Sequence, residues 1–370
     1  MISTKDFIKE LKRNNLDFAT GVPDSLLKDL CFDFEKIYKS NHLTASSEGS
    51  AVATAIGYNL KTNKIPIVYL QNSGLGNAIN PLISLADKDV YSIPIFIIMG
   101  WRGELGKKIK DEPQHISQGK VTIKFLKNLG IKYEILSQKS DFIKIIRDLK
   151  RYSEKDKSPV CLLVRKNSFQ SNKKIKSSLN SLILREKYLE FIIKKLPKGS
   201  SLITTTGILS REVYDILKKN KKKMNHFMCV GGMGHASSVA TGVAHCSKKK
   251  IYCFDGDGSI AMHMGSLSVS SKKKNIVHFL FNNYSHESVG GHDTSTKQVN
   301  FSKLAQVLGY KFSVRASNFQ DLEKNLNILK KKKESSFIEI ICGKGHRQDV
   351  SRPKESLLLL KNRFKFKIND

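Results

Sequence analysis

The stretch "IYCFDGDGSIAMHMGSL", residues 251–267, marks a point where a strand is expected to become a helix. Residues 251–254 form an apolar run that predicts a buried strand, and a helix is expected from near Ser259. Between them lie two acids and two glycines, Asp255, Gly256, Asp257 and Gly258. Such residues at the end of a buried strand cost stability, so we expect this turn to hold a ligand.

The same change from strand to helix recurs along the whole chain. Strands are expected at 17–20, 42–45, 65–70, 93–99, 132–135 and 160–164, and after a lysine-rich stretch at 201–204, 226–229, 250–254, 275–281, 311–314 and 337–341. Helices are expected to start near residues 24, 48, 76, 117 and 139, and then near 184, 209, 233, 259, 301 and 318. This repetition predicts an α/β protein with two doubly wound parallel-sheet domains, residues 1–168 and 184–370, joined by a linker, 169–183.

Length and composition agree with two globular domains. The 370 residues can bury two cores, and 40% of them are hydrophobic. No apolar run reaches the ~20 residues of a membrane helix, and the N-terminal segment predicts an amphipathic helix rather than a signal peptide. The six cysteines are scattered without a CxxC pair, which predicts reduced thiols in a cytoplasmic protein and argues against a zinc or iron–sulfur site.

The net charge is +31, and many of the lysines form short runs, such as residues 221–223, 248–250 and 330–333. A nucleic-acid-binding protein would concentrate basic residues on one element and interleave aromatic ones. We therefore favour a solvated lysine-rich surface over nucleic-acid binding. Such a surface would still attract anionic substrates.

Two asparagines follow the next expected strand, and the second of them is Asn283. In open α/β sheets ligands bind beyond the carboxyl ends of the strands, so Asp257 and Asn283 are expected to meet. A carboxylate, an amide oxygen and a backbone carbonyl suit Mg²⁺, and the N–H groups of Gly258 and Ser259 at a helix start suit phosphate. We expect Mg²⁺ and a diphosphate here. The alternative is two ordinary turns, because GDG and NN also occur in loops.

GDG followed by NN at this separation resembles the fingerprint of enzymes that use thiamine diphosphate. The resemblance implies that Asp257, Asn283 and the Ser285 carbonyl hold Mg²⁺, which binds the diphosphate. It also implies a glutamate against the cofactor's pyrimidine ring. Glu48, in "TASSEGSAVATAIGYNL", fits that role, although alone it could be an ordinary acid in the first turn of a helix.

The glycine-bearing strand ends complete the cofactor site that the resemblance implies. "VGGMGHASS" places Met233 where such enzymes have an apolar side chain that bends the cofactor, and the Gly231 carbonyl would accept from its amino group. The alternative for Met233 is an ordinary core residue. The other expected cofactor-binding residues are Thr206, Gly207, Gly256, Gly258 and Ser259.

Five segments narrow the resemblance to the phosphonopyruvate decarboxylase family over nearly the whole chain. They are "TGVPDSLLKDLC", "VYLQNSGLGNAINPLISLAD", "YSIPIFIIMGWRGE", "KDEPQHISQGK" and "NNYSHESVGG". The resemblance implies a pyrimidine-binding domain followed by a diphosphate-binding domain, and decarboxylation of 3-phosphonopyruvate to phosphonoacetaldehyde in phosphonate biosynthesis. Three features depart from the family pattern: a longer loop in "ELGKKIKDEPQH", Gly232 in place of serine, and "NNYSH" in place of a smaller turn.

Two candidates for substrate binding, Arg102 and His115, lie on the loop "WRGELGKKIKDEPQH", and a third, Asp24, follows the first expected strand. We expect Arg102 to bind the phosphonate, His115 to carry a proton and Asp24 to orient the substrate, the alternative being ordinary surface residues. Sulfopyruvate decarboxylase, or another thiamine diphosphate-dependent 2-oxo acid decarboxylase, is the main rival function. The domain order argues against a transketolase, the missing cysteine cluster against a ferredoxin-linked oxidoreductase, and "SGLGNA" lacks the last glycine of a dinucleotide-binding motif.

Glu48 falls in the first expected domain, and Asp257, Asn283 and Met233 fall in the second. The family implied by the resemblance packs the first domain of one chain against the second domain of its partner. We therefore expect a homodimer or larger even homo-oligomer with active sites shared between chains, and neither a nucleic-acid nor a membrane partner. The small-residue stretches 49–58 and 234–245 would suit a close interface, or packing within one chain.

Overall fold

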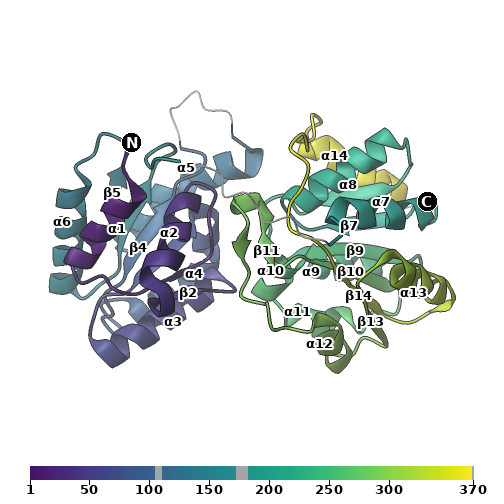
Figure 1. The fold of residues 1–370 in the computed structure, drawn as a ribbon, viewed down its shortest axis with the longest axis horizontal. Helices are drawn as coiled ribbons and strands as arrows, with labels where there is room; N and C mark the ends of the chain where they lie inside the picture. Colours follow the sequence, from purple (N-terminus) through teal and green to yellow (C-terminus); the bar gives the residue numbers. More distant parts are fainter. Residues whose placement is uncertain (105–110, 172–181, 369–370) are drawn as a thin grey trace. The chain divides into compact units, whose positions relative to one another are not determined.

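The computed structural model describes residues 1–104, 111–171 and 182–368, and the chain divides into two units, 1–175 and 176–370 (Figure 1). The first unit has one parallel sheet in the order β2-β1-β3-β4-β6-β5. Its strands are β1 (Ala19–Gly21), β2 (His42–Thr44), β3 (Ile67–Gln71), β4 (Phe96–Gly100), β5 (Lys132–Leu136) and β6 (Val160–Val164). Its helices are α1 (Thr4–Arg13), α2 (Lys28–Tyr38), α3 (Glu48–Thr62), α4 (Leu75–Pro81), α5 (Pro113–Asn128) and α6 (Phe142–Asp156).

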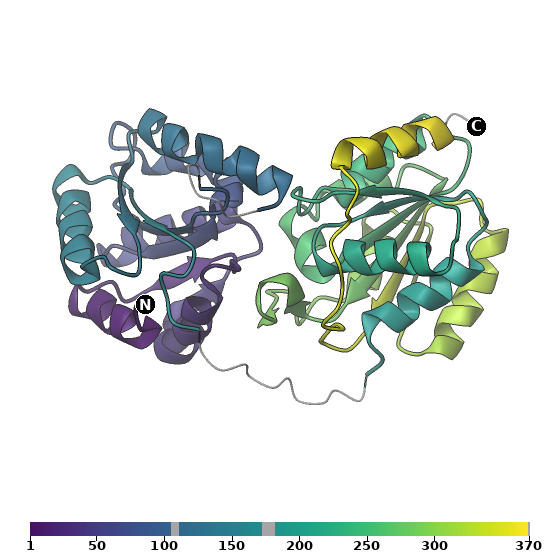
Figure 2. The same cartoon turned by 90° about the horizontal axis from the view of Figure 1, so that it is seen from above.

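Helices cover both faces of this sheet (Figure 2). Side chains of α1, α2 and α6 pack with Ile67, Phe96 and Val160 on one face, and side chains of α3, α4 and α5 pack with Val68 and Ile97 on the other. The strands are therefore buried on both sides. That is why they appear in the sequence as continuous apolar runs rather than as alternating ones.

The second unit repeats this architecture in the order β13-β14-β10-β9-β7-β8. Its parallel strands are β7 (Ser201–Thr204), β8 (Asn225–Met228), β9 (Ile251–Gly256), β10 (Ile276–Asn282), β13 (Phe312–Ala316) and β14 (Ser336–Ile341). Helices α7 (Arg185–Lys195), α8 (Ile208–Lys219) and α13 (Phe319–Lys331) contribute to the core on one face. The other core contains residues of α9 (Ala236–His245), α10 (Asp257–Met262), α11 (Ser266–Ser270), α12 (Phe301–Val307) and α14 (Leu357–Ile368). A short antiparallel hairpin, β11 (Ser285–His286) with β12 (His292–Asp293), follows β10.

The two sheets have the same topology. When the strands of each sheet are numbered in chain order, both read 2-1-3-4-6-5, with the direction of winding reversing between the first and third strands. Ligands of such sheets bind beyond the carboxyl ends of the strands at this reversal. Ligand-binding residues are therefore expected at the carboxyl ends of β1 and β3 in the first unit, and of β7 and β9 in the second.

The predicted fold class is confirmed, and each of the twelve expected strands overlaps an observed one. Several helix starts differ. Helix α2 begins at Lys28 rather than near Asp24, α5 at Pro113 rather than near Ser117, and α9 at Ala236 rather than near Met233. Asp24 is fully buried, and its carboxylate accepts from the Leu26 N–H (3.1 Å). Residues 24–27 therefore form a turn before α2 and not the first turn of the helix.

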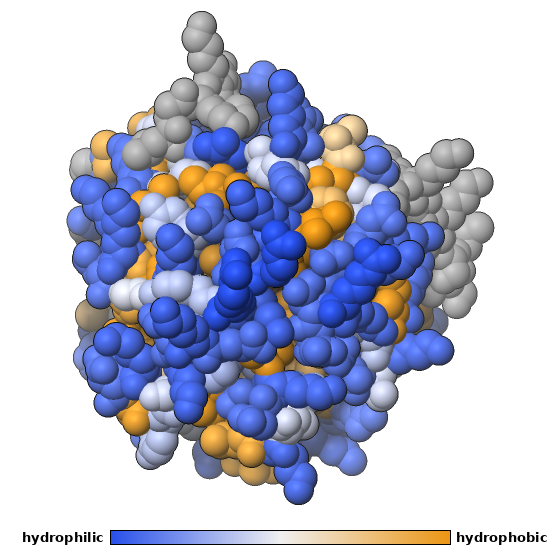
Figure 3. Space-filling view, turned by 90° about the vertical axis from the view of Figure 1, so that its left-hand side faces the viewer, coloured by the Kyte–Doolittle hydropathy of each residue, from blue (hydrophilic) through white to orange (hydrophobic). Residues whose placement is uncertain are grey.

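The surface and the cysteines agree with the composition. All six cysteines are free, and five of them are buried. The face shown in Figure 3 is mainly hydrophilic, with hydrophobic residues in small separate areas. Within the described ranges, no helix is both long enough and apolar enough to span a membrane.

Candidate active site

Asp257 is the first residue of α10, directly after β9, and its side chain is buried. Thr294 Oγ1 donates to Asp257 Oδ2 (2.7 Å), and the Asn283 backbone N–H donates to the same carboxylate. Burial raises the pKa of Asp257 to about 6 despite these hydrogen bonds. Asp257 and Asn283 therefore meet at the ends of neighbouring strands.

Asn283 lies in the turn that connects β10 to β11, Ser285 is the first residue of β11, and both are buried. Asn283 Nδ2 donates to Glu287 Oε1 (3.3 Å), and Asn283 Oδ1 accepts from the Ser285 N–H (3.1 Å). Ser285 Oγ is buried without a hydrogen-bond partner among the described residues. Tyr284 has a φ of 55°, a left-handed conformation that glycine adopts at lower cost, so the tyrosine in "NNYSH" occupies a strained position.

Gly258 and Ser259 form the first turn of α10. A Cβ atom at Gly258 would lie 2.6 Å from Cε1 of His286, so the imidazole packs directly against this glycine. Desolvation, with a smaller contribution from His292, lowers the pKa of His286 to about 4, which makes it neutral at physiological pH. The Ser259 hydroxyl accepts from the Gly234 N–H (3.0 Å) and hydrogen-bonds Thr205 (2.7 Å), so it joins three loops.

The remaining expected cofactor contacts lie on loops after β7 and β8. Thr206 Oγ1 donates to the Val230 carbonyl, and Gly207 has a φ of 82° at the start of α8. Met233 is half-buried and belongs to neither core of this unit, whereas Gly231 is exposed.

Glu48 is the first residue of α3 in the other unit, and its side chain is buried. Asn77 Nδ2 donates to Glu48 Oε2 (2.9 Å). A Cβ atom at Gly74 would lie only 2.2 Å from Glu48 Oε1, so this glycine leaves the room that the carboxylate occupies. Burial is the main cause of a raised pKa for Glu48.

Asp24 lies at the reversal point of the first sheet, where Gln71 Nε2 donates to Asp24 Oδ1 (2.5 Å). Arg102 follows β4 and already has partners: its guanidinium donates to both oxygens of Asp111 (2.5 and 2.9 Å) and to Ser25 Oγ (2.9 Å). Burial opposes ionisation of Asp111, but the hydrogen bond from Arg102 prevails and lowers its pKa to about 2.

His115, on α5, also lies beside the turn after β4. The backbone of His115 is so close that a Cβ atom at Gly103 would lie 1.9 Å from its carbonyl oxygen. His115 also contributes to the lowered pKa of Asp111. The part of the expected substrate loop at 105–110 lies outside the described residues.

The site contains residues that the sequence did not indicate: Thr294 and Glu287 beside the two expected metal ligands, Asn77 and Gln71 beside the acids of the first unit, and His286 against Gly258. Motif spacing could not identify Thr294, Asn77, Gln71 and His286, because their contacts join residues from different loops. Glu287 is the exception, since it lies four residues after Asn283 in the segment "NNYSHESVGG".

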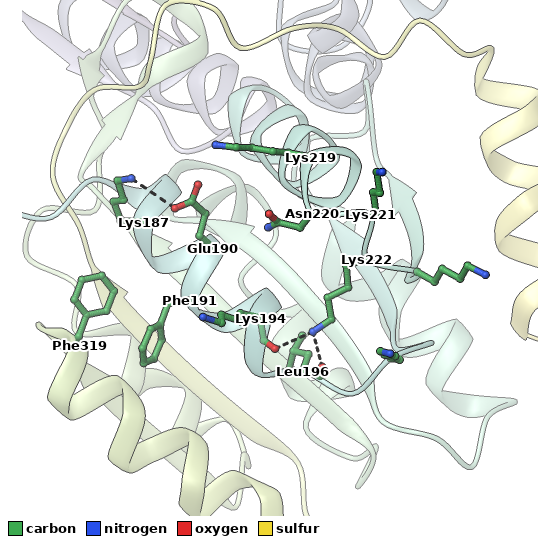
Figure 4. Close-up of a pocket in the computed structure, with 12 residues that line it drawn as sticks. Lys187, Glu190, Phe191, Lys194, Leu196, Lys219, Asn220, Lys221, Lys222 and Phe319 are labelled. Atoms are coloured by element: carbon green, nitrogen blue, oxygen red, sulfur yellow. Dashed lines mark hydrogen bonds and ion pairs between the residues drawn. The ribbon is translucent and has the colours of Figure 1, made fainter.

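A separate hollow of about 1170 Å³ lies on the second unit (Figure 4). Residues 196–198 and 219–223, which precede β7 and β8, form much of its lining, so it lies at the opposite edge of the sheet from Asp257. Lys222 Nζ donates to the carbonyls of Lys194 (2.9 Å) and Leu196 (2.8 Å), which satisfies the C-terminal end of α7. These lysines therefore belong to the solvated surface and to helix capping.

The oxygen donors of Asp257, Asn283 and Ser285 form a set that suits a hard cation. The unpartnered Ser285 hydroxyl is also consistent with a bound ligand. These residues therefore fit Mg²⁺ with a diphosphate.

Comparison with known proteins identifies relatives along nearly the whole chain. The model of the thiamine pyrophosphate enzyme N-terminal TPP binding domain matches residues 2–126, and that of the C-terminal TPP binding domain matches residues 206–340. A phosphonopyruvate decarboxylase from Streptomyces hygroscopicus is 30% identical over 87% of this chain and 83% of its own length. One from Streptomyces viridochromogenes is 28% identical over 99% of this chain and 94% of its own length. A sulfopyruvate decarboxylase from Methanosarcina acetivorans is 23% identical over 92% of this chain and 91% of its own length.

Proposed function

The chain belongs to the phosphonopyruvate decarboxylase family of thiamine pyrophosphate enzymes, and we propose that it converts 3-phosphonopyruvate to phosphonoacetaldehyde and CO₂. At a coarser level it is a thiamine diphosphate-dependent decarboxylase of the phosphonopyruvate or sulfopyruvate type. The observation that supports the substrate concerns relatives that match most of the chain: the Streptomyces phosphonopyruvate decarboxylases are 28% and 30% identical, and the sulfopyruvate decarboxylase is 23% identical. Sulfopyruvate decarboxylase subunits reach 30–32% identity over 44% of the chain or less. A role in phosphonate biosynthesis is part of the same proposal.

In this proposal Asp257, the Asn283 amide oxygen and the Ser285 carbonyl hold Mg²⁺, and the N–H groups of Gly258 and Ser259 bind phosphate oxygens. The hydrogen bonds from Thr294 and from the Asn283 backbone support the metal-binding carboxylate. When bound, thiamine diphosphate supplies the nucleophilic carbon and the electron sink for decarboxylation. Gly256, Thr206, Gly207, Gly231 and Met233 are the further proposed contacts to this cofactor.

Glu48 is the proposed residue that holds a proton against the pyrimidine ring. Asn77 occupies Oε2, and Gly74 leaves space around Oε1, so the second oxygen has a defined position. A raised pKa makes the carboxyl a better partner in proton exchange at neutral pH than an exposed glutamate.

For the substrate, we propose that Arg102 binds the phosphonate, that Asp24 orients the 2-oxo acid and that His115 supplies a proton. Arg102 would then have to exchange its contact with Asp111 for the substrate. The Lys- and Arg-rich surface, with a net charge of +31, would raise the local concentration of anionic substrates.

The proposal is tested by measuring CO₂ release from 3-phosphonopyruvate, sulfopyruvate and pyruvate with thiamine diphosphate and Mg²⁺. We expect kcat/KM for 3-phosphonopyruvate to exceed that for sulfopyruvate by about tenfold or more. Faster turnover of sulfopyruvate would contradict 3-phosphonopyruvate as the substrate, but it would agree with the proposed type of reaction. If none of the three acids releases CO₂, the proposed decarboxylase activity is contradicted.

A further inference from the structure

Three buried side chains with metal-binding atoms lie together on one face of the second sheet. Cys253 and Asp255 are alternate residues of β9, so they share a face, and His278 lies opposite Cys253 in the register of β10. Their relative exposures are 0%, 1% and 0%. The thiol sulfur, a carboxylate oxygen and an imidazole nitrogen lie within 4.8 Å of one another.

Two of these atoms lack the hydrogen bonds that buried polar atoms normally make. Asp255 Oδ2 and His278 Nε2 have no partner within the described part of the chain, and the 3.7 Å between them is too long for a hydrogen bond. Their other polar atoms are occupied: Asp255 Oδ1 accepts from the Gly256 N–H (2.9 Å), and His278 Nδ1 contacts the Tyr310 hydroxyl (3.3 Å). A buried carboxylate oxygen without a partner is costly, so a ligand between these atoms would remove the penalty.

The separation of these atoms suits a metal better than a hydrogen bond. Zinc binds nitrogen and oxygen at about 2.0–2.2 Å, so two such ligands in a tetrahedral site lie roughly 3.3–3.6 Å apart. The observed 3.7 Å is close to that separation. The contact of Tyr310 with the other imidazole nitrogen resembles the support that metal-binding histidines usually receive.

We propose that Cys253, Asp255 and His278 bind a zinc ion that joins β9 to β10. Thiolate and imidazole ligands select zinc over Mg²⁺ and Ca²⁺, which prefer oxygen. Burial raises the pKa of the Cys253 thiol, and metal binding would deprotonate it during folding.

This site is distinct from the proposed Mg²⁺ site, and its role is structural. It joins the two strands just before Asp257 and Asn283, so it would fix the ends of β9 and β10 relative to each other. The lack of a CxxC pair in the sequence argued against a zinc site. Ligands on neighbouring strands, however, need no such spacing. Only the pairing of β9 with β10 brings them together.

The test is elemental analysis of protein produced in zinc-supplemented medium and purified with Mg²⁺ and without a strong chelator. We expect about one zinc ion per chain in the wild type, and loss of it in Cys253→Ser and in His278→Gln. Cys161→Ser is the matched control, since Cys161 is equally buried but lies in the first unit. Protein produced with cobalt should show thiolate-to-cobalt absorption in the near ultraviolet, which Cys161→Ser keeps and Cys253→Ser loses.

Wild-type protein with neither bound zinc nor the cobalt absorption would overturn the proposal, and so would zinc retained by both variants. If the variants do not fold, the cobalt spectrum of the wild type decides. Both measurements are independent of decarboxylase activity, so they can fail or succeed whatever the substrate is.

Discussion

At the scale of single residues, Glu48 has a buried carboxyl whose ionisation the fold opposes. Because its pKa is raised on folding, the stability associated with its protonated form is complete below the unfolded pKa, near 4.3, and is lost as pH rises through the folded pKa. Glutamine carries no charge at any pH. We therefore predict that Glu48→Gln raises the melting temperature of the cofactor-free protein at pH 8, and that this gain shrinks towards pH 4.

The same substitution should reduce decarboxylation by about a hundredfold or more, with little change in cofactor affinity, because the metal and diphosphate contacts lie elsewhere. Thermal unfolding at several pH values and a cofactor titration measure the two effects. Glu134→Gln, at an exposed position, is the control and should change neither. A less stable Glu48→Gln protein at pH 8, or one with full activity, would contradict the assigned role.

Arg102 and Asp111 form a bidentate ion pair. Substitution of each residue distinguishes two roles for Arg102, which are binding of the phosphonate and maintenance of the loop. If Arg102 binds the phosphonate, Arg102→Ala should raise KM for 3-phosphonopyruvate more than for pyruvate. Asp111→Asn should then lower KM for 3-phosphonopyruvate, because it removes a competing carboxylate. If both substitutions impair the two substrates equally, the pair only maintains the loop. Steady-state kinetics with both acids distinguishes the two results.

At the scale of elements, the sequence predicted the sheets well and the turns poorly. Strands such as Val160–Val164 are buried on both faces, so their apolar runs are unambiguous. The hairpin Ser285–His286 with His292–Asp293 was missed because two-residue strands carry no periodicity, yet it precedes Thr294, the partner of Asp257. Asp257 and Asn283 could be predicted because each lies within three residues of the end of a predicted strand, whereas the partner of Asp257, Thr294, depends on a tertiary contact.

The start of α4 offers a test of how closely that helix fits Glu48. Gly74→Ala places a methyl group 2.2 Å from the present position of Glu48 Oε1, so the carboxylate must move. We predict a loss of activity of about tenfold or more, consistent with small displacements of catalytic groups. Gly76→Ala is the matched control, since nothing lies within 4 Å of its Cβ position. It should keep full activity and raise the free energy of unfolding by up to about 1 kcal/mol.

The short helix η4 (Glu287–Val289) connects Asn283 to the segment after β14. Glu287 accepts from the Asn283 amide (3.3 Å) and the Gly345 N–H (2.8 Å), and it contacts His346 (3.4 Å). We predict that Glu287→Ala weakens Mg²⁺ binding in the presence of thiamine diphosphate by about tenfold, because the Asn283 amide loses the group that orients it. Glu334→Ala, outside this cluster, should leave the Mg²⁺ titration unchanged. Unchanged Mg²⁺ binding in Glu287→Ala would show that Asn283 needs no such support.

At the scale of the whole molecule, the two units share one topology and carry different halves of the proposed chemistry. Glu48 belongs to the first unit, and Asp257 and Asn283 belong to the second. A cofactor that needs all three residues must contact both kinds of unit. We propose that the two units come from different chains of a homodimer or larger even assembly.

Subunit mixing tests this assembly directly. Glu48→Gln chains and Asp257→Ala chains should each be inactive alone. In a mixed dimer with shared sites, one site combines both substitutions and the other combines neither. Equal mixing should therefore restore about a quarter of wild-type activity, since half of the dimers are mixed and each has one intact site.

Mixing Glu48→Gln chains with chains that carry both substitutions is the control, because no arrangement of those chains regenerates an intact site. Subunit exchange is verified independently with differently tagged chains and native mass spectrometry. If exchange is complete and activity stays absent, each site is built within one chain. Activity in the control mixture would instead show that Glu48 is dispensable. Recovery confined to the first mixture would place Glu48 of one chain beside Asp257 of its partner.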